Sequence, residues 1–133
     1  MLTWPLTTGW VKAGHLINNQ SEESEMNNQD LMAENWTDES GNPAGGVASG
    51  TGFAISWQNG PLGRGEDRRE PNGAFVETII KAAMQRIEFY QGTRFKCEEN
   101  REAIYHLDMA LAELSSRTSR RESQNTEGTH SGN

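Results

Sequence analysis

Apolar residues recur at helical spacing in two stretches of the C-terminal half of the chain. Residues 75–91 carry one apolar stripe, formed by Val76, Ile79, Ile80, Ala83, Ile87 and Tyr90. Residues 98–122 carry a second stripe, formed by Ala103, Ile104, Leu107, Ala110, Leu111 and Leu114. One apolar stripe is typical of an amphipathic helix that packs through one face. Because only the short link 92–97 separates the stretches, the pattern predicts an antiparallel two-helix hairpin.

The ends of these helices also carry local signals. Asn72 or Gly73 stands where a capping residue is wanted before the first helix. Gly92 follows the last turn of that helix, where a left-handed residue often ends it. The glycine-rich run 60–65 lacks the Lys-Ser/Thr ending of a phosphate loop, so a turn is the favoured interpretation. Residues 123–133 look frayed, apart from any role of the run 126–129.

The N-terminal half contains weaker patterns. Residues 51–57 alternate Phe53, Ile55 and Trp57 with small or polar neighbours, which predicts a half-buried strand. Residues 1–17 could supply one or two short strands. Residues 18–46 are polar and resemble disordered or linker sequence, with room for a short helix around 28–36.

These elements predict an α+β fold with two regions. Residues 1–56 would form an acidic, partly disordered region with a small β portion, and residues 57–133 a helical-hairpin domain that binds a ligand. The chain has 133 residues, of which 33% are hydrophobic, so a lone copy buries only a thin core. A hairpin of two helices also leaves part of its apolar surface exposed to solvent. We therefore expect an oligomer, either a dimer or a higher assembly.

The charge of the chain is unevenly distributed. The formal net charge is −7, and residues 1–56 hold one lysine against seven acidic residues. An acidic chain argues against general binding to DNA or RNA, which needs a basic surface. Cys97 is the one cysteine, which excludes an intrachain disulfide and favours a reducing cytosol. No apolar run approaches the roughly 18 residues needed to span a bilayer, so we predict no membrane association.

Candidates for chemistry are few. Cys97, His15, His106 and His130 never reach the paired spacing of a zinc site, so no metal and no cofactor are predicted. No nucleophile motif, Walker loop or dinucleotide fingerprint is present, and we expect no enzyme activity.

Two groups of residues could instead bind a ligand. Arg117 and Arg121 are four residues apart and share a helix face; they are either cations favoured at a helix C-terminus or a pair that holds phosphates. Tyr90 and Asn100 flank the predicted turn and suit stacking and hydrogen bonding to a nucleobase, although packing and capping are their commoner uses.

Several motifs of residues 57–133 resemble a known family. They are the run 57–61, Asn72-Gly73, the runs 86–91 and 95–100, Ala103-Ile104, Arg117-Thr118, Arg121-Glu122 and the run 127–129. In combination they resemble the phage Thoeris anti-defence sponges, whose helical-hairpin domain is shared with the anti-CBASS sponge proteins. The resemblance covers about 75 residues. Glu99 and the run 123–125 depart from the pattern, because Arg commonly precedes the Asn and Ala-Arg-Gly-Val-like residues are usual near the end.

The resemblance implies a non-catalytic protein of the host bacterial cytoplasm that captures cyclic nucleotide immune signals. These are cyclic ADP-ribose isomers, cyclic dinucleotides or cyclic trinucleotides. By motif position it implies that Tyr90 stacks a base and that Asn100 hydrogen-bonds the ligand. It also implies that Arg117 and Arg121 hold phosphates and that Thr129 lies in a closing C-terminal segment. A homo-oligomer, as large as a hexamer, is part of the same expectation.

Spacing adds one constraint of its own. Asn100 and Arg117 are 17 residues apart, which on one helix is roughly 26 Å. If both contact one small ligand, they must come from different chains, as in an antiparallel two-fold pair. Two alternatives remain beside the sponge: an adaptor or assembly protein that binds another protein, and a nucleotide-degrading enzyme, for which no set of catalytic groups is visible.

Overall fold

The computed structural model describes residues 10–17 and 30–132. They form four strands followed by two helices, which confirms the predicted α+β class. The chain divides into two compact units. Among the described residues, the sheet unit contains 10–17, 30–62 and 69–74, and the helical unit contains 63–68 and 75–132.

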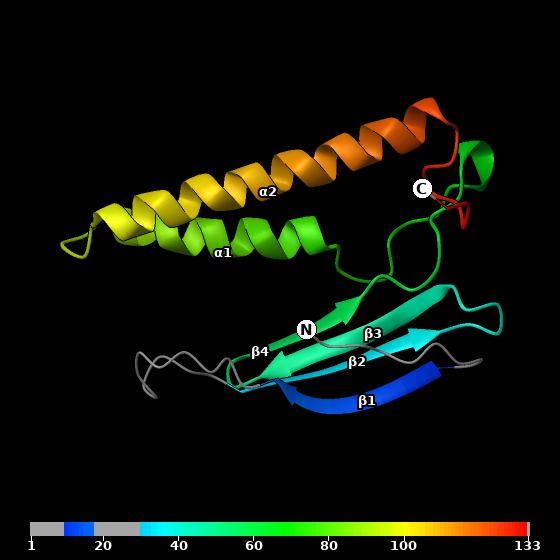
Figure 1. Ribbon diagram of the computed structural model, residues 1–133, viewed down its shortest axis with the longest axis horizontal. Coiled ribbons are helices and arrows are strands. Elements are labelled where there is room, and N and C mark those ends of the chain that lie inside the picture. The colour runs from blue at the N-terminus through cyan, green and yellow to red at the C-terminus, as the bar shows by residue number, and fades with distance from the viewer. Residues whose placement is uncertain (1–9, 18–29, 133) are drawn as a thin grey trace. The chain divides into compact units, whose positions relative to one another are not determined.

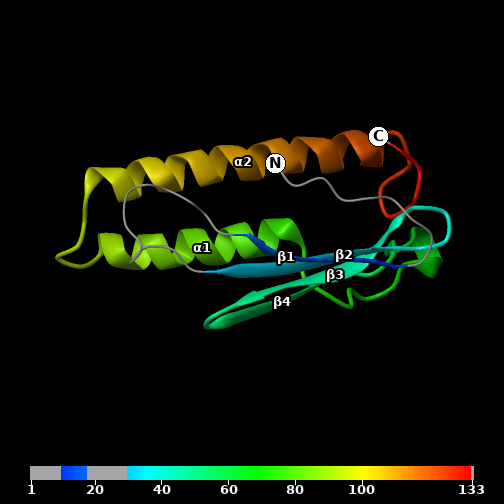
Figure 2. The same ribbon diagram turned by 60° about the horizontal axis from the view of Figure 1, so that its bottom comes forward.

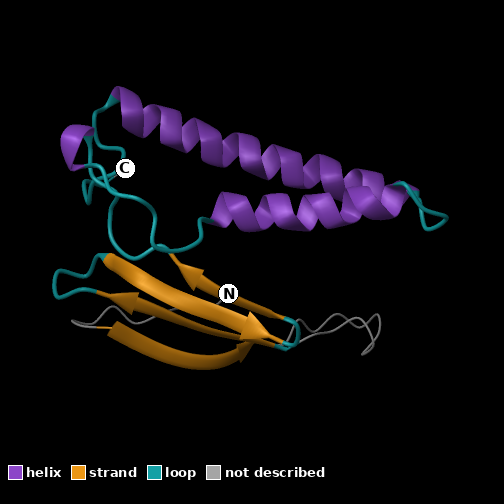
Figure 3. Ribbon diagram, turned by 180° about the vertical axis from the view of Figure 1, so that it is seen from behind, coloured by secondary structure: helices purple, strands orange, loops and turns teal. Residues whose placement is uncertain are grey.

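The sheet unit is an antiparallel meander in which each strand pairs with its neighbours in the chain (Figure 3). Its strands are β1 (Trp10–Ile17), β2 (Leu31–Thr37), β3 (Pro43–Gly50) and β4 (Phe53–Trp57). The strand predicted near residues 51–57 is confirmed as β4, and one strand lies within residues 1–17. Residues 1–9 and 18–29 are outside the described ranges, together with the predictions made for them.

Two predictions for the N-terminal half are wrong. The sequence left room for a short helix around 28–36, but residues 31–37 form β2; residues 18–46 resembled disordered or linker sequence, but β3 already begins at Pro43. The reason is non-local pairing, since Ala33 of β2 lies opposite Ala48 of β3. Ala48 is the one apolar side chain classed as buried among the described residues. Small residues such as Ala48 gave little local signal of a strand.

A short segment after β4 completes the sheet unit. Trp57 forms a parallel bridge with Ala74, whose N–H donates to Ser56 O at 2.7 Å. Asn72 was expected to cap the first helix, but its side chain accepts from Asn59 N and donates to Asn59 O. Gly73 has no room for a Cβ, which would lie 2.5 Å from the Trp57 carbonyl. The cap prediction is wrong because both residues are used to close this loop.

The helical unit is the predicted antiparallel hairpin, with α1 (Val76–Gln91) and α2 (Glu98–Ser123) side by side in Figures 1 and 2. The N-cap of α1 is Phe75, which makes no side-chain capping bond. Gly92 ends α1 with φ −88°, so the predicted left-handed conformation is wrong. Its N–H instead donates to Phe89 O at 3.0 Å, which closes the last turn tightly.

Candidate functional site

The first candidate residue, Tyr90, lies at the turn end of the hairpin. Its side chain is 37% exposed. The guanidinium of Arg86 lies 4.9 Å from the ring centroid, and its Nε donates to the Tyr90 hydroxyl at 3.3 Å. Arg86 is one turn earlier on α1, so the two side chains share a face of the helix. Stacking of the guanidinium orients the ring and places a cation beside it.

Asn100 lies in the first turn of α2 at the same end. It is half-buried, and its Nδ2 donates a long bond of 3.5 Å to Phe95 O. The turn before it is fixed by Gln91, whose side chain donates to Cys97 O and accepts from Cys97 N. The structure therefore brings Tyr90 and Asn100 to one end of the hairpin, on a turn that is held in shape.

Arg117 lies near the other end of α2 and is exposed. Arg117 makes no hydrogen bond or ion pair with any residue in the described ranges 10–17 and 30–132. Its guanidinium is a cation with unused donors, which suits an anionic ligand.

Arg121 is used differently from Arg117, although the two residues are one turn apart. It is 8% exposed, the most buried charged side chain among the described residues. Its guanidinium donates to three main-chain carbonyls: Ser131 O at 2.8 Å, Thr126 O at 2.8 Å and Thr129 O at 3.1 Å. These bonds fold the C-terminal segment back onto the end of α2. The expectation that residues 123–133 are frayed, apart from the run 126–129, is therefore wrong at Ser131, whose carbonyl accepts from Arg121 and whose N–H donates to Thr129.

Thr129 belongs to this folded segment. Its hydroxyl donates to Thr126 O at 2.6 Å and accepts from Ser131 N at 3.2 Å. The side chain is half-buried. Arg121 and Thr129 are therefore brought together by the fold, at the end of α2 that also carries Arg117.

A second set of contacts joins the segment to residues 63–68, which contain the short 3-10 helix η2 (Gly65–Asp67). Glu127 accepts a bond of 2.6 Å from Arg68 and lies 3.8 Å from the Arg64 guanidinium. Arg64 also donates to the Glu127 carbonyl at 2.8 Å. The hydrogen bond from Arg68, opposed in part by burial, lowers the pKa of the Glu127 carboxyl. Figure 3 shows the C-terminus beside this loop.

Glycine is required where the two segments touch. Gly63 N donates to Gly128 O at 2.8 Å. Gly128 has φ +78°, and a Cβ on it would lie 2.4 Å from Gly63 O. The glycine-rich run 60–65 was predicted as a turn, and its role as a dock for Gly128 was missed. The opposite charges of the loop arginines and of Glu127 were the sequence signal from which this contact between the two segments could have been predicted.

The spacing argument holds in the structure, because one continuous helix carries both Asn100 and Arg117. They lie 17 residues apart on α2, roughly 26 Å at about 1.5 Å per residue. Tyr90 and Asn100 lie at the turn end of the hairpin, and Arg117 lies at the opposite end of α2 with Arg121 and Thr129. Within one hairpin, no small ligand reaches both groups.

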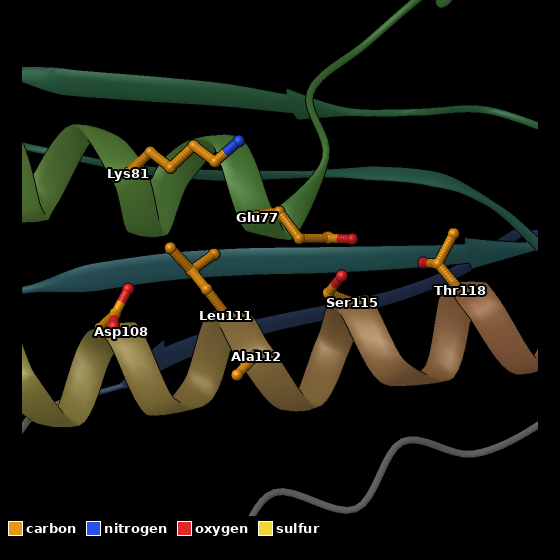
Figure 4. Close-up of a pocket in the computed structure, with 7 residues that line it drawn as sticks. All are labelled: Glu77, Lys81, Asp108, Leu111, Ala112, Ser115 and Thr118. Atoms are coloured by element: carbon orange, nitrogen blue, oxygen red, sulfur yellow. The ribbon is translucent and has the colours of Figure 1, made fainter.

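A groove between the helices contains none of the predicted site residues. Figure 4 shows its lining: Glu77 and Lys81 of α1, and Asp108, Leu111, Ala112, Ser115 and Thr118 of α2. Its volume is about 490 Å³. The described residues hold no group of three or more His, Cys, Asp or Glu side chains arranged for a metal. In the same residues, neither helix is long and apolar enough to cross a membrane.

Comparison with curated proteins finds a similar protein in a bacteriophage. The chain is 36% identical over 76 residues to Thoeris anti-defense 1 of Bacillus phage SBSphiJ7. The predicted resemblance to the Thoeris anti-defence family is confirmed. The match covers 57% of this chain and 51% of that protein, so the chain spans about half the length of its Thoeris relative. No protein-family model matches the chain.

Proposed function

We propose that the protein is a non-catalytic sponge that sequesters cyclic nucleotide immune signals in the cytoplasm of an infected bacterium. The candidate ligands are cyclic ADP-ribose isomers and cyclic di- or trinucleotides, and their capture would block Thoeris-type and CBASS-type anti-phage defence. The observation that carries the proposal is the match to Thoeris anti-defense 1. Capture needs a pre-ordered site rather than a reaction, since affinity rises when binding groups are already held in place.

The turn end of the hairpin would bind the base. One face of the Tyr90 ring is covered by the Arg86 guanidinium, and a nucleobase would stack on the ring. Asn100 would read the base or ribose through its carboxamide. The Gln91 bonds to Cys97 support this role, because they fix the turn that holds both residues.

The other end of α2 would bind phosphate. Arg117 is an exposed cation that makes no hydrogen bond or ion pair with any residue the structure describes, and it would contact the phosphates directly. Arg121 would contribute through the positive field at the same end, while its N–H groups hold the C-terminal segment. Thr129 lies in that segment and would close over the ligand.

Two chains would complete each site. Because roughly 26 Å separate Asn100 and Arg117 along α2, one ligand would take the turn end from one chain and the arginine end from another. An antiparallel two-fold pair then has two equivalent sites. The absence of any buried apolar side chain in either described helix supports self-association into a dimer or a larger assembly, such as a hexamer.

The second candidate function is a helical adaptor that binds another protein. The exposed apolar residues favour it, since Phe89 is 52% exposed and Phe95 is 61% exposed. An adaptor would form the same oligomer as a sponge, but it would not bind a cyclic nucleotide.

Incubation of the purified full chain with a panel of cyclic nucleotides tests the proposal. Thermal unfolding is followed with each ligand; the protein–ligand complex is then heated and the released compound is chromatographed. A sponge gives a large rise in Tm with one ligand or ligand class, and that ligand is recovered unchanged. A cleaved product would establish an enzyme instead. If no cyclic nucleotide changes the Tm, the sponge is refuted and the adaptor is the remaining candidate function.

A further inference from the structure

Two Asn-Gly dipeptides lie in the loop between β4 and α1, at Asn59-Gly60 and at Asn72-Gly73. Asn-Gly is the dipeptide in which an asparagine most readily loses its side-chain amide, because glycine has no side chain to block attack by its own nitrogen. Both dipeptides lie within the motifs that carry the family resemblance, and neither is a candidate ligand-binding residue pair. The structure holds the two asparagine side chains very differently.

The Asn72 side chain is restrained by two hydrogen bonds. Its Oδ1 accepts from Asn59 N at 2.8 Å, and its Nδ2 donates to Asn59 O at 3.0 Å. The Asn72 N–H donates to Gln58 Oε1 at 2.9 Å. Gly73 is closely packed, since a Cβ on it would lie 2.5 Å from the Trp57 carbonyl. For the Gly73 nitrogen to reach the amide carbon of Asn72, the side chain must rotate and break both of its bonds.

The Asn59 side chain has no such restraint. It is exposed, and among the residues that the structure describes its carboxamide makes no hydrogen bond. The Gly60 N–H donates to none of these residues either. Gly60 has φ +81°, and a Cβ on it would meet nothing within 4 Å. Gly45 lies beside Asn59 and leaves the amide carbon open on that side, because it has no Cβ, which would lie 3.5 Å from that carbon.

We propose that Asn59 is a site of spontaneous deamidation, with the Gly60 nitrogen as the nucleophile. This nitrogen gives up its proton to hydroxide and bonds to Cγ of Asn59. The Cγ–Nδ2 bond breaks, and the amide group takes a proton from water and leaves as ammonia. Water then opens the resulting cyclic imide at either of its carbonyl carbons, which leaves an aspartate or an isoaspartate at position 59. The reaction needs no ligand and is independent of the proposed function.

Deamidation changes the loop as well as its charge. The Asn59 carbonyl accepts from Asn72 Nδ2, and the Gly60 carbonyl accepts from Gln58 Nε2 at 3.1 Å. An isoaspartate adds one carbon to the main chain between these carbonyls, so the loop cannot keep both bonds as they are. The converted protein carries one more negative charge and can be separated by anion exchange. It should have a lower Tm than the intact chain, and an equal Tm would refute this effect on the loop.

Peptide mass spectrometry of the purified full chain, aged at mildly alkaline pH, tests the proposal. Trypsin separates the two sites, because Arg64, Arg68 and Arg69 lie between them. The peptide with Asn59 should gain one mass unit at least about tenfold faster than the peptide with Asn72, whose two hydrogen bonds must break first. A protein isoaspartate methyltransferase with labelled S-adenosylmethionine should label the same peptide, since isoaspartate is the substrate of that class of enzyme.

The same chain unfolded in urea is the matched control. Both sites then lack hydrogen bonds within the protein, so they should be converted at similar rates. Asn59→Gln should abolish the gain in mass of its peptide and leave the rate at Asn72 unchanged. Conversion of Asn72 as fast as Asn59 in the folded chain would overturn the proposal. It would also be overturned if Asn59 stayed intact in the folded chain while urea-unfolded protein was converted. An equally large difference between the sites in urea would attribute it to flanking residues and overturn the structural explanation.

Discussion

At the turn between α1 and α2, the side chains of Tyr90 and Asn100 are only partly covered and make few bonds within the chain. At the far end of α2, Arg121 is buried and donates to three carbonyls, while Glu127 is bound by two arginines. Both ends carry polar residues that the motifs mark as ligand-binding. At the turn end their polar groups are still available, whereas at the far end most of them hold the C-terminal segment in place.

The comparison separates two arginines that look equivalent in the sequence. Arg117 and Arg121 are one turn apart, yet Arg117 is exposed and Arg121 is 8% exposed. A motif position identifies a residue type but does not tell whether its donors are already used. We therefore expect substitution of Arg121 to lower the stability of the fold and substitution of Arg117 to weaken ligand binding.

The largest effect is expected from Arg121→Ala. The substitution removes the buried guanidinium that donates hydrogen bonds to three main-chain carbonyls. Each hydrogen bond to a charged group contributes about 1.5–3 kcal/mol. The free energy of unfolding should fall by at least about 3 kcal/mol, and nucleotide binding should be lost with it. Chemical denaturation measures the first effect. Arg120→Ala, at an exposed neighbour, is the control and should change little.

Arg117→Ala should instead weaken binding without weakening the fold. Loss of one charged contact to phosphate predicts a rise in Kd of about 10- to 100-fold. Titration calorimetry with the ligand found in the panel measures it, and Tm without ligand should be unchanged. Equal loss of stability in Arg117→Ala and Arg121→Ala would contradict the distinction between them.

Gly128→Ala should have a smaller effect on stability. The residue has φ +78°, which costs a non-glycine residue about 1–2 kcal/mol, and the new Cβ would press on Gly63 O. The helical unit should unfold at lower denaturant concentration. Gly132→Ala serves as the comparison, because a Cβ there meets nothing within 4 Å.

The smallest effect is the pH dependence of the Glu127 contact. Its pKa is lowered from 4.5, mainly by the hydrogen bond from Arg68. A lowered pKa means that the folded state favours the ionised carboxyl, so the contribution is full above pH 4.5 and is lost as pH falls through the lowered value. Glu127→Gln should be less stable than the original chain at neutral pH, and the difference should shrink in acid. A difference that grows in acid would contradict the assignment.

The sequence was a good guide where structure depends on local periodicity. Both helices, the turn between them and β4 follow from spacing of apolar residues such as Leu107 and Ile55. It failed for β2 and β3, whose small and polar residues become strands through pairing such as Ala33 with Ala48. It also missed the bonds of Arg121 and the docking of Gly128, because these join segments whose approach no local pattern encodes.

Mixing two defective variants tests most directly whether two chains complete each ligand site. Asn100→Ala and Arg117→Ala are prepared separately, and each should bind cyclic nucleotide poorly. In a mixed dimer, one site combines both substitutions and the other has Asn100 and Arg117 both intact. Co-expression should therefore restore tight binding with a stoichiometry well below that of the original protein. If the mixture binds no better than either variant alone, while mixed dimers are present, the two-chain site is wrong.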